Sequence, residues 1–223
     1  MKFTALFRRL TASPGLLSLL LFTLMSAVLV VVRLRSTDSL RFIFMLWNLF
    51  LGWIPWLLAA WMSHKQRPTW ALLLTGLVWL LFLPNAPYML TDLFHLRTRA
   101  GIPLWYDLVL IMSCAWTGLA LGMDSIWRVQ ELVSGAIKRN WSRLFTPVVI
   151  YLSAYGVYLG RYGRWNSWDL VSQPDSLMRY VIEPLADPDE HVNLWAFSLI
   201  FGTFLYLMYL SWAYLPSKKP SGA

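Results

Sequence analysis

Long apolar blocks, each nearly free of charged residues, follow one another along the whole of this 223-residue chain. A helix needs about 20 such residues to cross the roughly 30 Å hydrocarbon core of a bilayer, where backbone polar groups find no water. With 58% hydrophobic and only 13% charged residues, the composition also lies far from that of a soluble globular domain. The blocks therefore predict an all-α, polytopic transmembrane helix bundle.

About six spans are expected, together forming a single integral membrane domain over residues 1–223. They lie at residues 15–32, 42–62, 70–90, 104–123, 144–161 and 194–214. The first follows a basic N-terminal stretch but lacks a small-residue cleavage site, so we expect an uncleaved anchor. The third is expected to be broken by Pro84, because proline removes a backbone donor.

Two connections are expected to form short helices that lie along the membrane. In residues 126–141, apolar residues recur at helical spacing opposite charged ones. In the longest outer loop, Asp175 or Ser176 is expected to cap a helix that ends in the region of residues 184–188. Its membrane-facing residues are expected to be Leu177, Val181 and Leu185.

The basic residues predict the orientation. With the N-terminus inside, the cytoplasmic segments, which include Lys2 and Lys218, carry eleven Lys and Arg residues and the opposite side carries eight. Positive residues favour the cytoplasmic side, so both termini are predicted to be cytoplasmic. The net charge of +8 comes from short clusters beside the apolar blocks. We therefore expect the lipid bilayer, and no nucleic acid, as the partner.

The break in the third span carries polar residues into a region where each uncompensated polar group is costly. Its sequence is Leu83-Pro84-Asn85-Ala86-Pro87-Tyr88. If the chain continues as an α-helix, Tyr88, Asp92 and His95 share one face at i, i+4 and i+7. A polar stripe is thus expected just after the break.

Two other segments are expected to bring polar residues to the same outer boundary. Asp107 lies about one turn inside the fourth span, and the fifth span is followed by Arg161, Arg164, Asn166 and Asp169. Asp92, His95 and Asp107 are the candidate catalytic acids and bases. The candidate substrate-binding residues are Asn85, Tyr88, Arg161, Arg164, Asn166 and Asp169.

The fifth span itself has two stripes. Ser153, Gly156, Gly160 and Gly163 permit close helix approach, whereas Tyr151, Tyr155, Tyr158 and Tyr162 lie roughly opposite. Packing is the preferred interpretation of both stripes. The single cysteine, Cys114, lies within an apolar block and is expected to pack there.

Three blocks of residues, in order, resemble a known family. They are Leu83-Pro84-Asn85 with Tyr88, Thr91-Asp92 and His95; Trp105-Tyr106-Asp107; and Gly160-Arg161 with Arg164 and Asn166-Ser167-Trp168-Asp169. The chain is similar to bacterial integral membrane proteins grouped as domain of unknown function 1361. The resemblance covers the third to fifth helices and implies a bacterial inner (plasma) membrane protein. It implies no activity, substrate or cofactor.

Three functions are compatible with these residues. The preferred one is an envelope enzyme that uses Asp92, His95 or Asp107 as acid or base, with Arg161 or Arg164 holding an anionic lipid or lipid-linked substrate. A small transporter or ion pathway is the second, with the broken helix, Asp107 and Asn48 as its elements. In the third, the protein is a structural or assembly partner. Its aspartates then pair with arginines only to pin helix ends: Asp92, Asp107 and Asp169 with Arg97, Arg99, Arg161 and Arg164.

No motif decides among these functions. The chain contains no nucleophile motif, phosphate loop or HExxH sequence. Asp92 and His95 with Asp107, Glu190 or His191 make a metal site conceivable, but no ligand pair has diagnostic spacing, so no metal is assigned. The sequence indicates no cofactor and leaves a homo-oligomer open.

Overall fold

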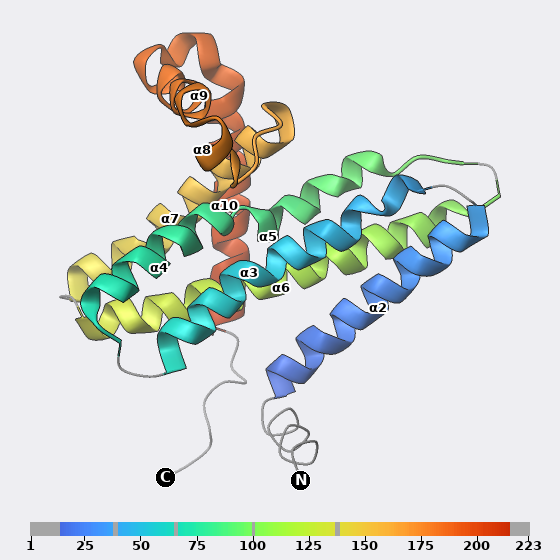
Figure 1. Cartoon of the computed structure of the whole chain (residues 1–223), viewed down its shortest axis with the longest axis horizontal. Coiled ribbons are helices and arrows are strands. Elements are labelled where there is room, and N and C mark those ends of the chain that lie inside the picture. Colours follow the sequence, from blue (N-terminus) through green and yellow to red (C-terminus); the bar gives the residue numbers. More distant parts are fainter. Residues whose placement is uncertain (1–13, 38–39, 65–66, 100, 137–138, 215–223) are drawn as a thin grey trace. The chain divides into compact units, whose positions relative to one another are not determined.

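The computed structural model describes residues 14–37, 40–64, 67–99, 101–136 and 139–214 (Figure 1). Within these ranges the chain is helical and forms no named strand. The α-helices (α) and 3-10 helices (η) are α2 (Pro14–Thr37), η1 (Leu40–Phe42), α3 (Phe44–His64), α4 (Thr69–Phe82), α5 (Asn85–Tyr88), η2 (Met89–His95), α6 (Leu104–Ala136), α7 (Arg139–Tyr162), α8 (Asp169–Ser172), α9 (Pro174–Ala186), η3 (Pro188–His191) and α10 (Val192–Tyr214). Lys2 and Lys218, used above for orientation, lie outside the described residues.

Membrane-spanning helices are confirmed. Among the described residues, five helical stretches are long and apolar enough to cross a bilayer: Gly15–Thr37, Leu40–His64, Thr69–His95, Leu104–Ala136 and Pro188–Ala213. The remaining expected span corresponds to α7, which is a helix of 24 residues but carries four tyrosines and three arginines. These polar groups lower its mean hydropathy below that of the other five.

The surfaces of these helices are apolar. Leu77 of α4 and Ile200 of α10 are 68% and 71% exposed, and similar large apolar side chains project from α2, α3 and α6. Soluble monomers rarely expose contiguous apolar patches of this kind. The chain is therefore a multi-pass membrane protein in a lipid bilayer environment.

Two details of the helices differ from expectation. Residues 126–136 form no separate interfacial helix but continue α6, and Ile126 and Val129 are buried against protein. Helical periodicity alone does not distinguish a lipid-facing stripe from a protein-facing one. The helix expected in the connection before the last span is present as α9, but it begins at Pro174 and continues through Pro184, and its Leu177 is buried rather than exposed.

The chain divides into two compact units, which are described separately. The first unit comprises Met1–Trp53 and Asn85–Gly122, and the second comprises Ile54–Pro84 and Met123–Ala223. A single integral membrane domain remains a prediction.

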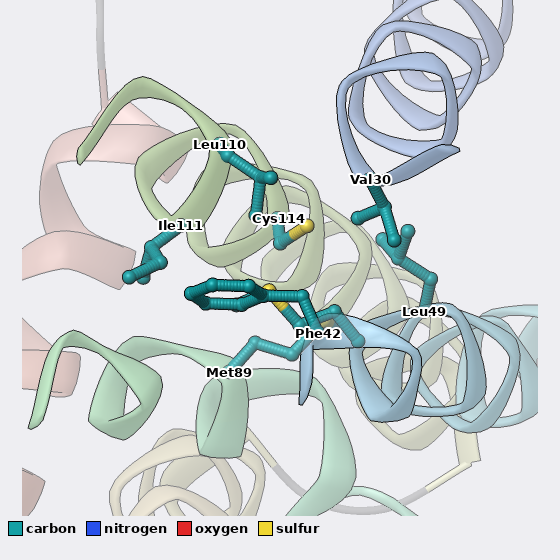
Figure 2. Close-up of a cluster of buried hydrophobic side chains, with 8 residues drawn as sticks. Val30, Phe42, Leu49, Met89, Leu110, Ile111 and Cys114 are labelled. Atoms are coloured by element: carbon teal, nitrogen blue, oxygen red, sulfur yellow. The ribbon is translucent and has the colours of Figure 1, made fainter. Parts of the chain in front are cut away.

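The core of the first unit joins four helical segments around Phe42. Figure 2 shows Val30 of α2, Leu49 of α3, Met89 of η2 and Cys114 of α6 pointing into one cluster of buried side chains. All of them are at most 3% exposed. The thiol of Cys114 thus packs in the apolar core, as its position in an apolar block predicts.

In the second unit, the tyrosines of α7 pack against α10. The ring of Tyr155 lies 5.9 Å from that of Trp195, and a side-chain Cβ placed on Gly202 would meet the ring of Tyr151 at 2.5 Å. The Tyr151 hydroxyl is hydrogen-bonded to that of Thr203 at 2.9 Å. These contacts agree with the packing interpretation of the tyrosine stripe.

Candidate functional site

The break after α4 fits against α6 because α6 carries glycine there. A Cβ on Gly118 would collide with the carbonyl oxygen of Ala86, and a Cβ on Gly122 would lie 3.2 Å from the Ala86 side chain. On α3, a Cβ on Gly52 would meet the end of the Met89 side chain at 2.7 Å. The backbone of α5 therefore packs directly on two glycines, which fix where the following residues lie.

After the break the chain tightens into a 3-10 helix, and this changes which residues share a face. With about three residues per turn, i and i+3 align. The aligned set is therefore Met89, Asp92 and His95, not the expected Tyr88, Asp92 and His95. Met89 and Asp92 are buried at 0% and 1% exposure, whereas His95 is half-buried.

Asp92 is held against α3. Its Oδ2 accepts a hydrogen bond of 3.0 Å from the Nδ2 of Asn48. Both residues lie within candidate membrane spans. A carboxyl group with this burial is costly, and a hydrogen bond from a neighbouring helix offsets part of that cost.

Asp107 lies in a separate, strongly charged cluster. Its Oδ1 accepts from Nε of Arg33 at 2.6 Å, and its Oδ2 accepts from Nη2 of Arg33 at 3.2 Å and from Nη1 of Arg99 at 3.1 Å. The side chains of Arg33 and Asp107 are only 4% and 3% exposed. A bidentate pair with this burial is among the strongest polar contacts a protein can make.

The remaining contacts of the two arginines connect three chain segments. Arg33 donates from Nη1 to the Thr37 hydroxyl, and Arg99 donates from Nη2 to the backbone carbonyl of His95. Both guanidinium groups also lie over the ring of Phe42, at 5.3 and 5.2 Å from its centroid. The cluster thus fixes the end of α2, the end of η2 and the start of α6, which supports the pinning interpretation for Asp107.

His95, Asn85 and Tyr88 are further predicted site residues that belong to the first unit. The ring of His95 packs 5.2 Å from that of Phe44. Asn85 and Tyr88 are the first and last residues of α5, and both are half-buried. Arg97 is exposed.

The end of α7 has an unusual backbone. Arg164 has a φ of +57°, in the left-handed region, where side chains other than glycine are disfavoured. The N–H of Trp165 returns to the carbonyl of Leu159 at 3.2 Å. Gly163 is required by close packing, because a Cβ there would lie 2.8 Å from the ring of Tyr180. This tight turn leaves the Arg164 side chain exposed.

Asp169 closes the next turn. Its Oδ2 accepts from the backbone N–H of Asn166 at 2.7 Å and from the Asn166 side-chain amide at 3.3 Å, and its Oδ1 accepts from the Ser172 hydroxyl at 2.9 Å. The backbone hydrogen bond from Asn166, followed by those of the Ser172 and Asn166 side chains, lowers the pKa of Asp169. Ser167, between them, donates to the carbonyl of Leu81 at 3.0 Å.

The predicted residues therefore fall into three local groups. Asp92 with Asn48, and Asp107 with its arginines, belong to the first unit, whereas Arg161, Arg164, Asn166 and Asp169 belong to the second. The convergence of all of them on one boundary stays a prediction. The predicted first span ends at residue 32, so Arg33 lies directly beyond it in the sequence. This position directly after the apolar block was the indication of its role. The helix α2 continues to Thr37, so Arg33 lies inside the helix.

A second charged cluster was not anticipated. Asp124 accepts from the indole N–H of Trp56 at 2.8 Å and from Nε of Arg128 at 2.7 Å.

Among the described residues, no three His, Cys, Asp or Glu side chains gather closely enough to hold a metal ion.

Comparison with models of protein families gives a match. The family model described as "Protein of unknown function (DUF1361)" matches residues 47–208, which include the helix break, η2, α6 and the turn after α7. No curated protein and no solved structure matches the chain. The chain thus belongs to the family of proteins of unknown function DUF1361.

Proposed function

We propose that this protein moves a proton or another small cation into or through the membrane, with Asp92 as the exchanging group. The observation that carries the proposal is the burial of Asp92, at 1% exposure, in a broken helix within a candidate span. Ionisable residues inside the membrane are expensive and generally mark ion or proton pathways. Interrupted helices are also where transporters place their binding groups.

The contacts of Asp107 argue against that residue as the exchanging group. A cation or proton arriving at Asp107 would compete with the three guanidinium donors that already occupy its oxygens. The amide of Asn48, in contrast, donates to Asp92 whether the carboxyl group is ionised or protonated. The Asp92–Asn48 contact therefore survives a cycle of binding and release.

The test is flux in sealed vesicles that contain the full-length protein and a pH-sensitive dye. A potassium gradient imposes a potential across the vesicle membrane. We expect the vesicle interior to acidify faster than in protein-free vesicles, and we expect this faster acidification to be lost in Asp92→Asn. Asp189→Asn, at an exposed aspartate of η3, is the matched control and should keep the wild-type rate. Wild-type vesicles that pass protons, sodium and potassium no faster than protein-free vesicles would refute the proposal.

A second candidate is the envelope enzyme that acts on an anionic lipid headgroup. The strained backbone of Arg164 favours it, since a non-glycine residue in the left-handed region costs about 1–2 kcal/mol. Glycine would remove this cost but would also remove an exposed guanidinium group, three residues from Arg161. Such a group suits a phosphate or carboxylate.

The enzyme candidate has its own test. In a strain that lacks the protein, wild-type protein should restore the lipid profile, and Arg164→Gly should fail although it accumulates at least as well. Arg164→Lys keeps the charge and should restore part of the effect. Full restoration by Arg164→Gly would exclude a headgroup role for this residue without affecting the flux test at Asp92.

A further inference from the structure

The helix α9 has two faces with evident roles. Leu177 and Pro184 are buried and form its inner face. Asp175, Arg179 and Glu183 follow one another at four-residue spacing and form an exposed charged face. Together these two faces leave the remaining third of the helix surface without an assigned role.

The third face is apolar and exposed. Met178, Ile182 and Leu185 recur at i, i+4 and i+7 and are 46%, 50% and 60% exposed. We call these three residues the α9 stripe. The neighbouring short helix α8 adds Val171, which is 86% exposed. An apolar surface of this kind requires a partner that removes it from water.

The position of α9 in the chain suggests its partner. The candidate span that contains α10 begins at Pro188, only three residues after Leu185. The indole N–H of Trp195 in α10 donates to the carbonyl of Pro184 at 3.2 Å, which ties the end of α9 to the start of the span. Figure 1 shows α8 and α9 gathered at one end of α10. The stripe therefore lies within reach of a membrane boundary.

Aromatic residues around α9 point to the same environment. Tyr180 of α9 packs against Trp165 at a ring separation of 5.9 Å, and Trp168 is 42% exposed. Tryptophan and tyrosine are enriched where hydrocarbon meets the headgroups. The hydroxyl of Tyr155 in α7 donates to the carbonyl of Val181 at 2.8 Å, so α9 is also held to α7.

We propose that α9 lies in the membrane interface, with the α9 stripe at the boundary between headgroups and acyl chains and the charged face toward water. A helix in this position buries its apolar face roughly 5–10 Å into that boundary. The charged face holds two acidic residues and one arginine, so attraction to anionic lipids does not drive the insertion. Burial of the stripe does, and the insertion should not depend on the anionic lipid content.

The test places a polarity-sensitive fluorophore on single cysteines of the full-length protein, at Ile182 in the stripe and at Glu183 on the charged face. The buried Cys114 is replaced by Ser. The proteins are reconstituted in phosphatidylcholine vesicles that carry a spin label near the headgroup end of the acyl chains. We expect blue-shifted emission and several-fold stronger lipid quenching at Ile182, and quenching by aqueous iodide at Glu183. Replacing part of the phosphatidylcholine by phosphatidylglycerol should change neither result.

Met178→Cys labels a second position of the α9 stripe and should behave like Ile182→Cys. It controls for a local disturbance of the structure by either substitution. Equal access of iodide to Ile182 and Glu183 would overturn the proposal by showing that the stripe faces water. Blue-shifted emission at Ile182 without quenching by the lipid spin label would also overturn it, because protein, from another copy or a partner, would then cover the stripe.

Discussion

At the scale of single residues, three aspartates that look alike in the sequence have different surroundings. Asp107 accepts from two guanidinium groups, Asp92 accepts from an amide, and Asp169 accepts from the backbone and side chains of its own turn. The donors around a carboxyl group determine which hydrogen bonds its replacement removes. These three residues are therefore separable by mutation.

Replacing the two buried aspartates should affect stability unequally. Asp107→Asn leaves the buried Arg33 without a carboxylate, and breaking a buried ion pair costs about 3–5 kcal/mol. Asp92→Asn keeps a side chain able to bond Asn48 and should cost about 1–2 kcal/mol. Unfolding of the purified protein in mild detergent with increasing denaturant measures both. Asp175→Asn, at an exposed position, should match the wild type, and equal losses in the two buried variants would contradict the assignment.

The lowered pKa of Asp169 predicts a dependence of stability on pH. A carboxyl group whose pKa is lower in the folded state stabilises the fold fully above its ordinary pKa of 3.8, and this contribution is lost as pH falls through the lower folded value. Asp169→Asn should therefore melt below wild type at pH 7, and the difference should shrink as pH falls below the ordinary pKa. Thermal unfolding at a series of pH values measures this, with Asp189→Asn as control. A difference that is constant with pH would contradict it.

The sequence identified these aspartates, and Arg99 as a partner of the group, but it did not pair Asp92 with Asn48 or Asp107 with Arg33. Asn48 and Arg33 lie 44 and 74 positions away in the chain from the carboxyl groups they bind. Spacing within one helix cannot reveal such pairs. The turn around Asp169 is local, with its donors three residues away on either side, but a run of polar residues like this one is also typical of a substrate site. Local hydrogen bonding was the competing explanation.

At the scale of elements, the break in the third span was predictable and its geometry was not. Pro84 and Pro87 mark where the helix must stop, because each removes a backbone donor. The choice of a 3-10 helix afterwards moves Met89, rather than Tyr88, onto the face of Asp92. That choice depends on contacts with α3 and α6, and in the sequence Gly118 is only one more small residue in an apolar run.

Gly118 should consequently be intolerant of even a methyl group. In Gly118→Ala the new Cβ meets a backbone oxygen of Ala86, which cannot move without shifting α5, and such overpacking costs about 1–3 kcal/mol. Gly76 of α4 has open space around it, so Gly76→Ala should be neutral or slightly stabilising, because alanine favours helices. Denaturant unfolding measures both. Gly118→Ala should also lower the proposed proton flux that depends on Asp92. Unchanged stability of Gly118→Ala would show that α5 does not pack as described.

At the scale of the whole molecule, hydropathy predicted most of the spans because lipid imposes the same requirement on each of them. The helix α7 is the instructive case. Its tyrosines lower its mean hydropathy, yet the hydroxyl groups of Tyr151 and Tyr155 have partners within the protein, at Thr203 and at the carbonyl of Val181. Hydropathy counts a polar atom whether or not it has a partner, so it underestimates a helix like this one.

We therefore expect α7 to cross the membrane, since its 24 residues extend about 36 Å and the hydrocarbon core is about 30 Å thick. Single cysteines at the exposed residues Arg97, Glu131 and Asp175, labelled from one side of intact cells by a membrane-impermeant reagent, measure this. If α6 and α7 both cross, Arg97 and Asp175 will label together and Glu131 only after permeabilisation. If α7 does not cross, Glu131 and Asp175 will share a side. Because the positive residues predict a cytoplasmic N-terminus, Arg97 should be the residue that labels from outside.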